Sequence, residues 1–399
     1  MITSLTIKGY RSLKDVTIPL GPLNVMIGPN GGGKTNIMDV LALLQEAATG
    51  SLSDAIDRRG PIRSLLFAGG AKSIEVAVEI SLPPGFRRAL RSGAQKTLRY
   101  AVTLAPAGGG YYVKSERMWS DDVRKALGFP VFAGRGVLAR ATQTAAKTFL
   151  AEHQMTPAEL ALSRPDSVLS PVARLRLTFL KKVLGRAVCV YGLPDTRTDA
   201  PMRQPQVARM ESVLKRDSSN LPAVLQLISQ SDRYEHMYED IESELRAGFP
   251  QEFRGLKFPS SGGDGRIAMR WREKAFPDRS FDAYEISDGT INFVRLATLL
   301  AGSTTPQVVC IDEPEVGLHP RLIRLVAEML QANAGPRQFI VATHSPALVD
   351  KLNPEEVLVV EKTEGATQVR RLDPDDLKHW LDKFSLGELW QTGQLEKTV

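Results

Sequence analysis

The sequence has only two cysteines and five histidines among 399 residues, so it indicates neither a disulfide framework nor a cluster of metal ligands. Cys189 and Cys310 each lie in a short apolar run, which favours thiols in a reducing, cytoplasmic setting. No apolar run approaches the ~18 residues that a membrane-spanning helix needs. The opening stretch, MITSLTIKGYRSLKD, lacks a charged segment followed by an apolar one, so we expect a first strand there and no signal peptide.

Charge is unevenly spread along the chain. The net charge is +6, and residues 121–217 carry 16 Lys and Arg against 9 Asp and Glu, which leaves about −1 for all other residues. A basic middle segment indicates a polyanionic partner such as nucleic acid. A solvated helical lobe that is rich in arginine fits the same composition.

Periodic patterns divide the chain into three segments. In residues 1–120 we expect strands, a helix from Lys34 to Ala48 and an antiparallel meander, because apolar residues alternate in SIEVAVEIS and TLRYAVTLA. Residues 121–255 are interrupted by prolines and predict a compact, mainly helical insertion. In residues 256–399 strands and helices alternate, which predicts an α/β core with a parallel sheet.

The stretch GPNGGGKT, residues 28–35, fits the pattern G-x-x-x-x-G-K-[ST] of phosphate-binding loops, between a predicted strand and a predicted helix. Glycines let backbone N–H groups curl around phosphate oxygens, and the helix adds the positive end of its dipole. Lys34 should reach the β- and γ-phosphates of ATP, and the Thr35 hydroxyl should bind Mg²⁺. The expected nucleotide-binding residues of this stretch are Asn30, Gly31, Gly32, Gly33, Lys34, Thr35 and Asn36.

A second motif, VVCIDEPEVGLHP, places two acidic residues after an apolar run. Residues 308–311 predict a buried strand that delivers Asp312 and Glu313 to the edge where α/β proteins bind ligands. Asp312 would hold Mg²⁺, and Glu313 would be the general base toward the attacking water. His344 ends the predicted strand QFIVATH, which should run parallel to the acidic strand and bring the histidine beside the γ-phosphate.

A third stretch, ISDGT, residues 286–290, opens an apolar helix with Ile291, Val294 and Leu296 as candidate core residues. Together, GPNGGGKT, ISDGT, VVCIDEPEVGLHP and VATHSP resemble the RecF- and SMC-type ATP-binding-cassette ATPases. More narrowly, they resemble the ATPase part of bacterial OLD-like (overcoming lysogenization defect) proteins. The resemblance implies an α/β, ABC-type P-loop ATPase head with an antiparallel β subdomain and the inserted helical lobe.

The resemblance also implies a homodimer that encloses two ATP molecules. Ser287 and Gly289 would bind the γ-phosphate of the ATP held by the other subunit. Asp288 departs from the commoner Ser-Gly-Gly order, and its charge would repel a phosphate unless it caps the helix or points away. Arg11 matches a basic position near the nucleotide. His319 lies where many relatives have aspartate, in a loop that crosses the dimer interface.

Many OLD-like proteins carry a Toprim nuclease domain after the ATPase. Such a domain needs an acidic residue after one strand and an Asp-x-Asp pair later; here VVEK supplies Glu361, and LDPDD supplies Asp373 and Asp375. Glu361 and Asp373 are 12 residues apart, too few for the helix and strand that should separate them. Asp373 and Asp375 more simply begin a helix. We therefore expect an ATP hydrolase without nuclease activity of its own.

Two functions remain open from the sequence. The first is an ATP-gated clamp on double-stranded DNA, in DNA repair or phage defence, that holds phosphates without reading bases. The second is an ATP-sensing subunit that controls a separate nuclease or toxin and binds little DNA. A transporter ATPase is disfavoured by the unusual signature and by the lack of an identifiable glutamine loop, since Gln45 lies inside the P-loop helix. The candidate DNA contacts are Arg174, Arg176, Lys181 and Lys182.

Overall fold

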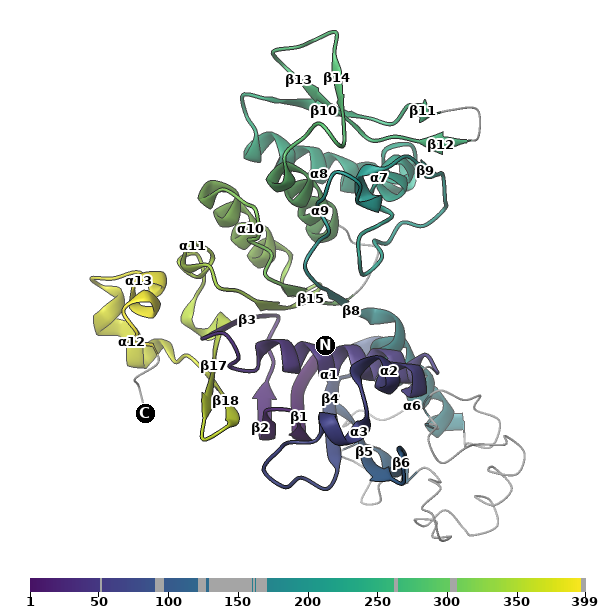
Figure 1. The fold of residues 1–399 in the computed structure, drawn as a ribbon, viewed down its shortest axis with the longest axis vertical. Helices are drawn as coiled ribbons and strands as arrows, with labels where there is room; N and C mark the ends of the chain where they lie inside the picture. Colours follow the sequence, from purple (N-terminus) through teal and green to yellow (C-terminus); the bar gives the residue numbers. More distant parts are fainter. Residues whose placement is uncertain are drawn as a thin grey trace. The chain divides into compact units, whose positions relative to one another are not determined.

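The computed structural model describes residues 1–50, 52–89, 97–120, 127–128, 160, 162, 171–261, 265–301 and 307–395. The chain divides into two compact units, each built from two stretches of sequence. Unit 1 comprises residues 1–189 and 358–371, and unit 2 comprises residues 190–357 and 372–399. Figure 1 traces the elements of both units from purple at the N-terminus to yellow at the C-terminus.

An antiparallel sheet with the strand order β2-β1-β4-β5-β6-β7 forms one layer of unit 1. In β4 every second side chain is buried, as the alternation in SIEVAVEIS predicts. β4 pairs antiparallel with β5, and β5 with β6, which confirms the meander. The strands are β1 (Ile2–Tyr10), β2 (Leu13–Pro19), β4 (Ile74–Ser81), β5 (Thr97–Ala107), β6 (Gly110–Ser120) and β7 (Leu127–Gly128).

A strand, a loop and a helix carry the glycine-rich motif of unit 1. β3 (Leu23–Ile27) is buried along its whole length, and α1 (Lys34–Ala48) has the bounds that the sequence predicts. β3 lies beside β17 (Val357–Thr363), which forms an antiparallel hairpin with β18 (Ala366–Arg371). The other elements of this unit are α2 (Leu52–Arg59), α3 (Ile62–Leu65), α4 (Pro84–Ala89), α6 (Pro171–Lys181) and the π-helical turn η2 (Lys182–Ala187).

Unit 2 contains two parallel strands and two long helices that carry the second and third sequence motifs. β15 (Val308–Asp312) pairs with β16 (Gln338–Ala342) in the predicted parallel sense, and α10 (Pro320–Asn333) connects them. α9 (Asp288–Ala301) is buried from Ile291 to Leu300, because the predicted core residues and most of their neighbours are apolar. The signature stretch therefore lies where a buried helix reaches the surface.

Unit 2 also contains further helices and two small sheets. α7 (Leu221–Ser229) and α8 (Glu235–Gly248) are separate helices joined by the 3₁₀ turn η4 (Asp232–Tyr234). Two small sheets have the strand orders β10-β13-β14 and β11-β12-β9. Their strands are β9 (Gln206–Val207), β10 (Phe253–Lys257), β11 (Ser260–Ser261), β12 (Arg266–Ile267), β13 (Arg270–Glu273) and β14 (Ser280–Asp282). The short elements that complete the unit are η3 (Pro201–Arg203), α11 (Pro346–Val349), η5 (Pro354–Glu356), α12 (Pro374–Leu381) and α13 (Leu386–Gln391).

The predicted segment boundaries at 120 and 255 stay predictions. Much of the predicted insertion, including residues 121–126, 129–159 and 163–170, lies outside the described residues. Within the described part of the insertion, α6, α7 and α8 are helical, and β8 (Val188–Tyr191), β9 and β10 add strands.

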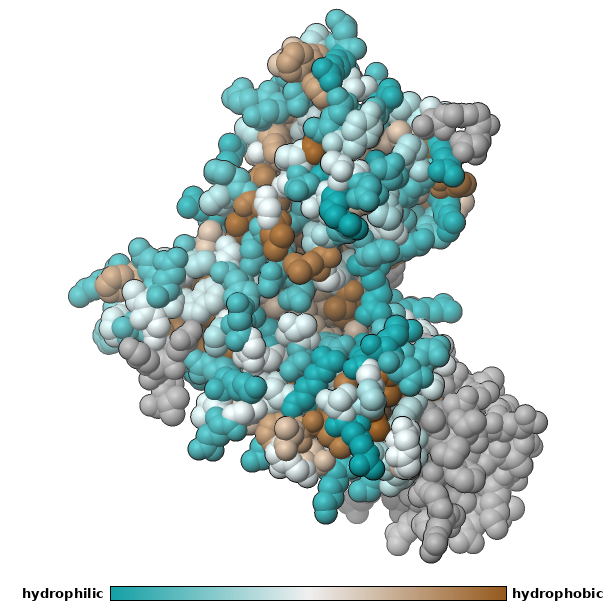
Figure 2. All heavy atoms as spheres, viewed as in Figure 1, coloured by the Kyte–Doolittle hydropathy of each residue, from teal (hydrophilic) through white to brown (hydrophobic). Residues whose placement is uncertain are grey.

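Apolar side chains gather mainly inside each unit, as the buried strands and α9 illustrate. The face seen in Figure 2 is largely hydrophilic, with scattered apolar patches. Among the described residues, no helix has both the length and the apolar character needed to span a membrane.

Candidate functional site

The glycine-rich loop of unit 1 exposes its tip and buries its base. Pro29, Asn30 and Gly31 are exposed, whereas Gly32, Gly33 and Lys34 are buried. Gly28, Gly31 and Gly33 have φ angles of 137°, 77° and 119°, a region that side-chain-bearing residues rarely adopt. The loop therefore curls in a way that only this glycine pattern permits without strain.

Two of these glycines also allow close packing within the protein. A Cβ atom at Gly28 would collide with the Val360 carbonyl group of β17, and one at Gly33 would collide with the Thr367 side chain of β18. A Cβ atom at Gly31 would meet no other atom within 4 Å. The glycines at the base thus let the β17–β18 hairpin approach the loop, and Gly31 at the tip leaves room for a ligand.

Lys34 and Thr35 open helix α1. The Lys34 ammonium group donates hydrogen bonds to the carbonyl oxygens of Gly28 (2.7 Å) and Pro29 (3.2 Å), so it lies within the curl of the loop. Thr35 is exposed at the first turn. No side chain of the described residues caps α1, and its first turn holds no acidic residue. Its N-terminal N–H groups and dipole therefore favour an anion.

A brace from β18 fixes the loop from behind. The Thr367 hydroxyl group donates to the Gly32 carbonyl oxygen (2.8 Å), and its oxygen lies 2.7 Å from the Ser12 hydroxyl oxygen. The Asn36 amide donates to the same Ser12 hydroxyl (2.8 Å). Thr367 is 3% exposed, so solvent cannot easily replace these bonds. The sequence gives no sign of this role, because a threonine in a strand is an ordinary β-former.

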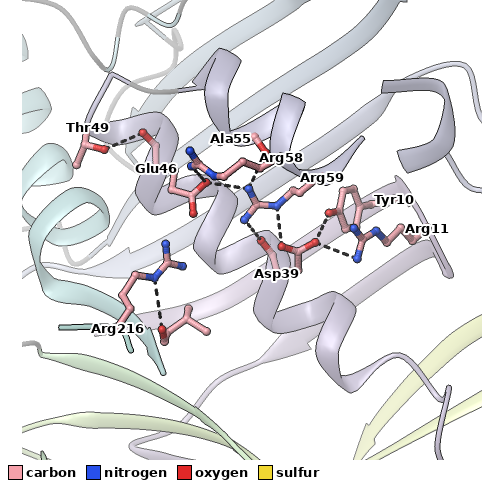
Figure 3. Close-up of polar contacts among 10 residues, drawn as sticks. Tyr10, Arg11, Asp39, Glu46, Thr49, Ala55, Arg58, Arg59 and Arg216 are labelled. Carbon is pink, nitrogen blue, oxygen red and sulfur yellow. Dashed lines mark hydrogen bonds and ion pairs between the residues drawn. The ribbon is translucent and has the colours of Figure 1, made fainter. Parts of the chain in front are cut away.

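Arg11 is held against helix α1 (Figure 3). Its guanidinium group lies 3.1 Å from the Asp39 carboxylate. It also lies 3.4 Å from the Asn36 side-chain oxygen. The Tyr10 hydroxyl donates to Asp39 at 2.5 Å, and burial together with this carboxylate raises the pKa of Tyr10. Arg11 has a positive φ of 46°, which costs of order 1 kcal/mol in a residue with a side chain. Arg11 itself lies outside α1, and its contacts to Asp39 and Asn36 hold its side chain against the first two turns of that helix.

A second arginine extends this network along the helix. Arg59 of α2 donates to Asp39 (2.6 Å) and to Glu46 (2.8 Å), and Arg58 reaches Glu46 at 3.0 Å (Figure 3). Arg59 is 10% exposed at its side chain, so these ion pairs are better shielded from solvent than surface pairs. The helix that begins at the phosphate loop is thereby fixed along one face.

In unit 2 the parallel pairing of β15 and β16 brings the predicted acidic residues next to the predicted histidine. Asp312 lies opposite Ala342, and the Glu313 N–H donates to the Ala342 carbonyl oxygen at 2.9 Å. The His344 Nε2 atom lies 3.9 Å from the Glu313 carboxylate, too far for a direct hydrogen bond. Glu313 has φ 46°, a conformation that strained functional residues often have.

Glu315 supports this cluster. Its Oε1 atom accepts a hydrogen bond from the His344 backbone N–H at 2.6 Å. Its Oε2 atom is buried and lacks a hydrogen-bond partner within the described part of the chain. The sequence offered one signal for Glu315, its place one residue after the Asp-Glu-Pro run, but nothing that separated it from an ordinary loop glutamate.

The signature turn of unit 2 caps helix α9 with serine. The Ser287 Oγ atom accepts from the Thr290 backbone N–H (3.1 Å) and lies 2.8 Å from the Thr290 hydroxyl oxygen. Ser287 thus takes the capping role that Asp288 was a candidate for. A Cβ atom at Gly289 would collide with the Gly317 carbonyl oxygen, so the glycine allows the acidic loop to approach the turn.

Two buried polar residues of α9 hold neighbouring loops. Asn292 donates to the carbonyl oxygens of Pro314 (3.3 Å) and Val316 (2.8 Å), both in the loop after the acidic strand. Arg295, 1% exposed, donates to the Ser218 hydroxyl at 2.9 Å. Hydrogen bonds therefore join the signature helix to the acidic loop within unit 2.

Other residues that the sequence analysis singled out have structural contacts. The His319 Nδ1 atom accepts from the Arg321 N–H at 3.3 Å and caps α10. Asp373 accepts from the Asp375 N–H at 2.9 Å and caps α12, so these carboxylates begin a helix as predicted. Gln45 donates weakly to the Gly185 carbonyl oxygen (3.5 Å) from within α1.

Two family models match this chain. Residues 1–76 match the model described as "AAA ATPase domain", and residues 214–350 match "AAA domain, putative AbiEii toxin, Type IV TA system". A curated protein, the OLD nuclease of Thermus scotoductus, is 24% identical over 410 residues, which cover 99% of this chain and 69% of that protein. The first model spans the glycine-rich loop, and the second spans the signature turn, the acidic strand and His344.

Solved structures of Smc heads share the fold. A head bound to the C-terminal winged-helix domain of ScpA superposes with a TM-score of 0.55 at 17% identity, over 95% of this chain and 99% of that one. An Smc head from Pyrococcus furiosus, also bound to a ScpA domain, gives 0.53 at 15% identity, over 96% and 98% of the two chains. The fold is thus the α/β ATPase-head fold that the motifs predict.

Proposed function

We propose that this chain, an ATPase of the AAA and OLD type built on the fold of an Smc head, hydrolyses ATP as a dimer. Each subunit would bind ATP at its glycine-rich loop, and the signature turn of the other subunit would complete the site. The observation that carries the proposal is the Ser287 turn. It is an exposed helix N-terminus on an otherwise buried helix, and a hydrogen bond from Asn292 joins that helix to the acidic loop.

The residues of the loop suit a nucleotide with its metal ion. The exposed tip, the free space at Gly31 and the uncapped start of α1 fit a triphosphate. The Thr35 hydroxyl and the Asp312 carboxylate are oxygen ligands of the kind that Mg²⁺ prefers. When bound, the ion would neutralise phosphate charge. Lys34 would bind the β- and γ-phosphates, and Arg11 would add positive charge beside them.

Glu313 and His344 would carry the chemical step. The Glu313 carboxylate would accept a proton from the attacking water as that water bonds to the γ-phosphorus atom and the bond to ADP breaks. His344 would donate a hydrogen bond to the γ-phosphate and keep it aligned. Glu315 positions the histidine through its backbone N–H.

Complementation between two inactive variants tests the shared site. Lys34→Ala removes the phosphate lysine, and Ser287→Asp keeps a helix cap but places a carboxylate at the proposed γ-phosphate position. Each variant alone should be inactive. A mixture should recover up to roughly a quarter of the native ATPase rate, because half of the dimers would contain one intact composite site. The control is Ser287→Asn, whose side chain can also cap α9 but carries no negative charge. A mixture as inactive as its components would show that the site lies within one subunit.

Duplex DNA is the partner that we propose for the ATP-bound dimer, in DNA repair or phage defence. The +7 surplus of residues 121–217 supports a polyanion, and the relative's name, OLD nuclease, points to nucleic acid. The second candidate is a regulatory ATPase that controls a separate nuclease or toxin. The family description "putative AbiEii toxin, Type IV TA system" favours that possibility.

The salt dependence of DNA binding separates these candidates. Arg174, Arg176 and Lys181 belong to α6, and Lys182 begins η2. Changing all four to glutamine should weaken binding and flatten the log–log salt slope by roughly one for each DNA phosphate that is no longer neutralised. The matched control changes four exposed basic residues outside this segment to glutamine and should leave the salt slope unchanged. No binding by the native protein at low salt, with or without ATP, favours the regulatory candidate. The control residues are Arg233, Arg254, Arg324 and Lys383.

A further inference from the structure

A buried arginine supports the signature turn. Arg203 belongs to η3, and its side chain is 1% exposed. Its Nη1 atom donates to the carbonyl oxygens of Ala283 and Ile286 (2.7 Å for Ile286). Its Nη2 atom donates to the Asp288 carboxylate at 2.6 Å. These hydrogen bonds all fall on the short stretch that leads into α9.

A further hydrogen bond ties the same guanidinium group to its own loop. Its Nε atom donates to the Thr196 carbonyl oxygen at 2.8 Å. A buried guanidinium group is costly unless its donors are satisfied, and here four hydrogen bonds, three to backbone carbonyls and one to a carboxylate, use four of its five N–H groups. Such a planar, multidentate group fixes direction as well as distance. The turn before Ser287 is therefore held in one shape from a loop that lies far earlier in the sequence.

The ion pair with Arg203 also explains how a phosphate can approach Asp288. The Asp288 side chain is 65% exposed, and a bare carboxylate there would repel an approaching phosphate. Paired with Arg203, it adds no net charge to the turn. Ser287 supplies the helix cap, so Asp288 is free for this pairing.

We propose that Arg203 is a positioning residue that shapes the Ser287 turn and neutralises Asp288 for the γ-phosphate of the partner subunit's ATP. This inference rests on the proposed function, because it assumes that the turn binds a phosphate in a second copy of the chain. It differs from a purely structural role in one respect. If the role of Arg203 were only structural, the charge at Asp288 would have no effect on dimerisation once the arginine had been removed.

The test uses the Glu313→Gln background, in which ATP-bound dimers should persist, and measures dimer dissociation by light scattering. Arg203→Met should weaken ATP-driven dimerisation at least about tenfold, because it leaves the negative charge of Asp288 without its counter-ion. Adding Asp288→Asn to Arg203→Met should restore part of the affinity between subunits. ATP affinity at the glycine-rich loop should not change in any of these variants. Arg197→Met is the control, since Arg197 is 75% exposed and paired only near the surface.

Hydrogen exchange and dimerisation together distinguish failure of the positioning role from failure of the proposed function. Hydrogen exchange of the amides of residues 284–290, without nucleotide, should speed up in Arg203→Lys, whose ammonium group cannot replace the whole set of guanidinium hydrogen bonds. If Arg203→Met with Asp288→Asn dimerises no better than Arg203→Met alone, or if exchange in Arg203→Lys is unchanged, the positioning role is overturned. If Glu313→Gln with native Arg203 does not dimerise with ATP, the proposed function fails instead, and the exchange result still stands by itself.

Discussion

Replacing Lys34 with alanine should reduce ATP affinity more than about a hundredfold, because charge-assisted bonds to phosphate are among the strongest single contacts in such sites. Lys34 is 6% exposed and lies inside the loop curl, so no other ammonium group can take its place without moving the loop. Binding of a fluorescent ATP analogue measures the affinity, and phosphate release should fall with it.

Removal of the lysine also removes its bonds to Gly28 and Pro29, so the thermal unfolding of the variant must be measured beside its affinity. Lys14→Ala is the matched control, since Lys14 is an exposed lysine of β2 in the same unit. Native ATP affinity in a folded Lys34→Ala protein would rule out the phosphate role of the glycine-rich loop.

Glu313→Gln should slow hydrolysis by about 10²–10⁴ while ATP still binds, because the amide cannot accept the proton of the attacking water. The substitution keeps the size of the side chain, and the backbone N–H bond to Ala342 is unaffected. If hydrolysis opens the dimer, the variant should accumulate as an ATP-bound dimer, which light scattering detects as a doubled mass.

A second glutamate provides the control for the strained backbone. Glu364 also has a positive φ, of 50°, and lies in the β17–β18 turn. Glu364→Gln should therefore hydrolyse ATP at the native rate and remain in the native equilibrium between monomer and dimer. A Glu313→Gln protein that stays monomeric in saturating ATP would contradict the shared-site dimer.

The parts that could be predicted from the sequence are those with strong local patterns. α1 has the predicted bounds because glycines end before Lys34 and apolar residues then recur with helical spacing. The parallel pairing of β15 and β16 followed from two apolar runs separated by a helix. Because each of these strands has a clear local pattern, Asp312, Glu313 and His344 could be placed at neighbouring strand ends.

The supporting residues could not be predicted, since their partners are remote in the sequence. Arg203 stands in the proline-flanked stretch APMRQPQ, and no periodicity connects it to Asp288. Thr367 contacts Ser12 across 355 residues. Asp288 was open between a cap and a repelling charge, because its counter-ion was not identifiable without the fold. The roles of the predicted nucleotide residues stay predictions, to be decided by the variants above.

The brace behind the glycine-rich loop has a consequence for the order of folding. Residues 358–371 complete unit 1, although they follow almost all of unit 2 along the chain. During synthesis the loop emerges early, but the Thr367 hydroxyl group can reach Gly32 only after the 335 residues that separate them have been made, and the Val360 carbonyl group comes shortly before Thr367. Contacts of such large sequence separation form slowly, because a long loop must close first. Competence to bind nucleotide would therefore arise only after residues 358–371 have left the ribosome.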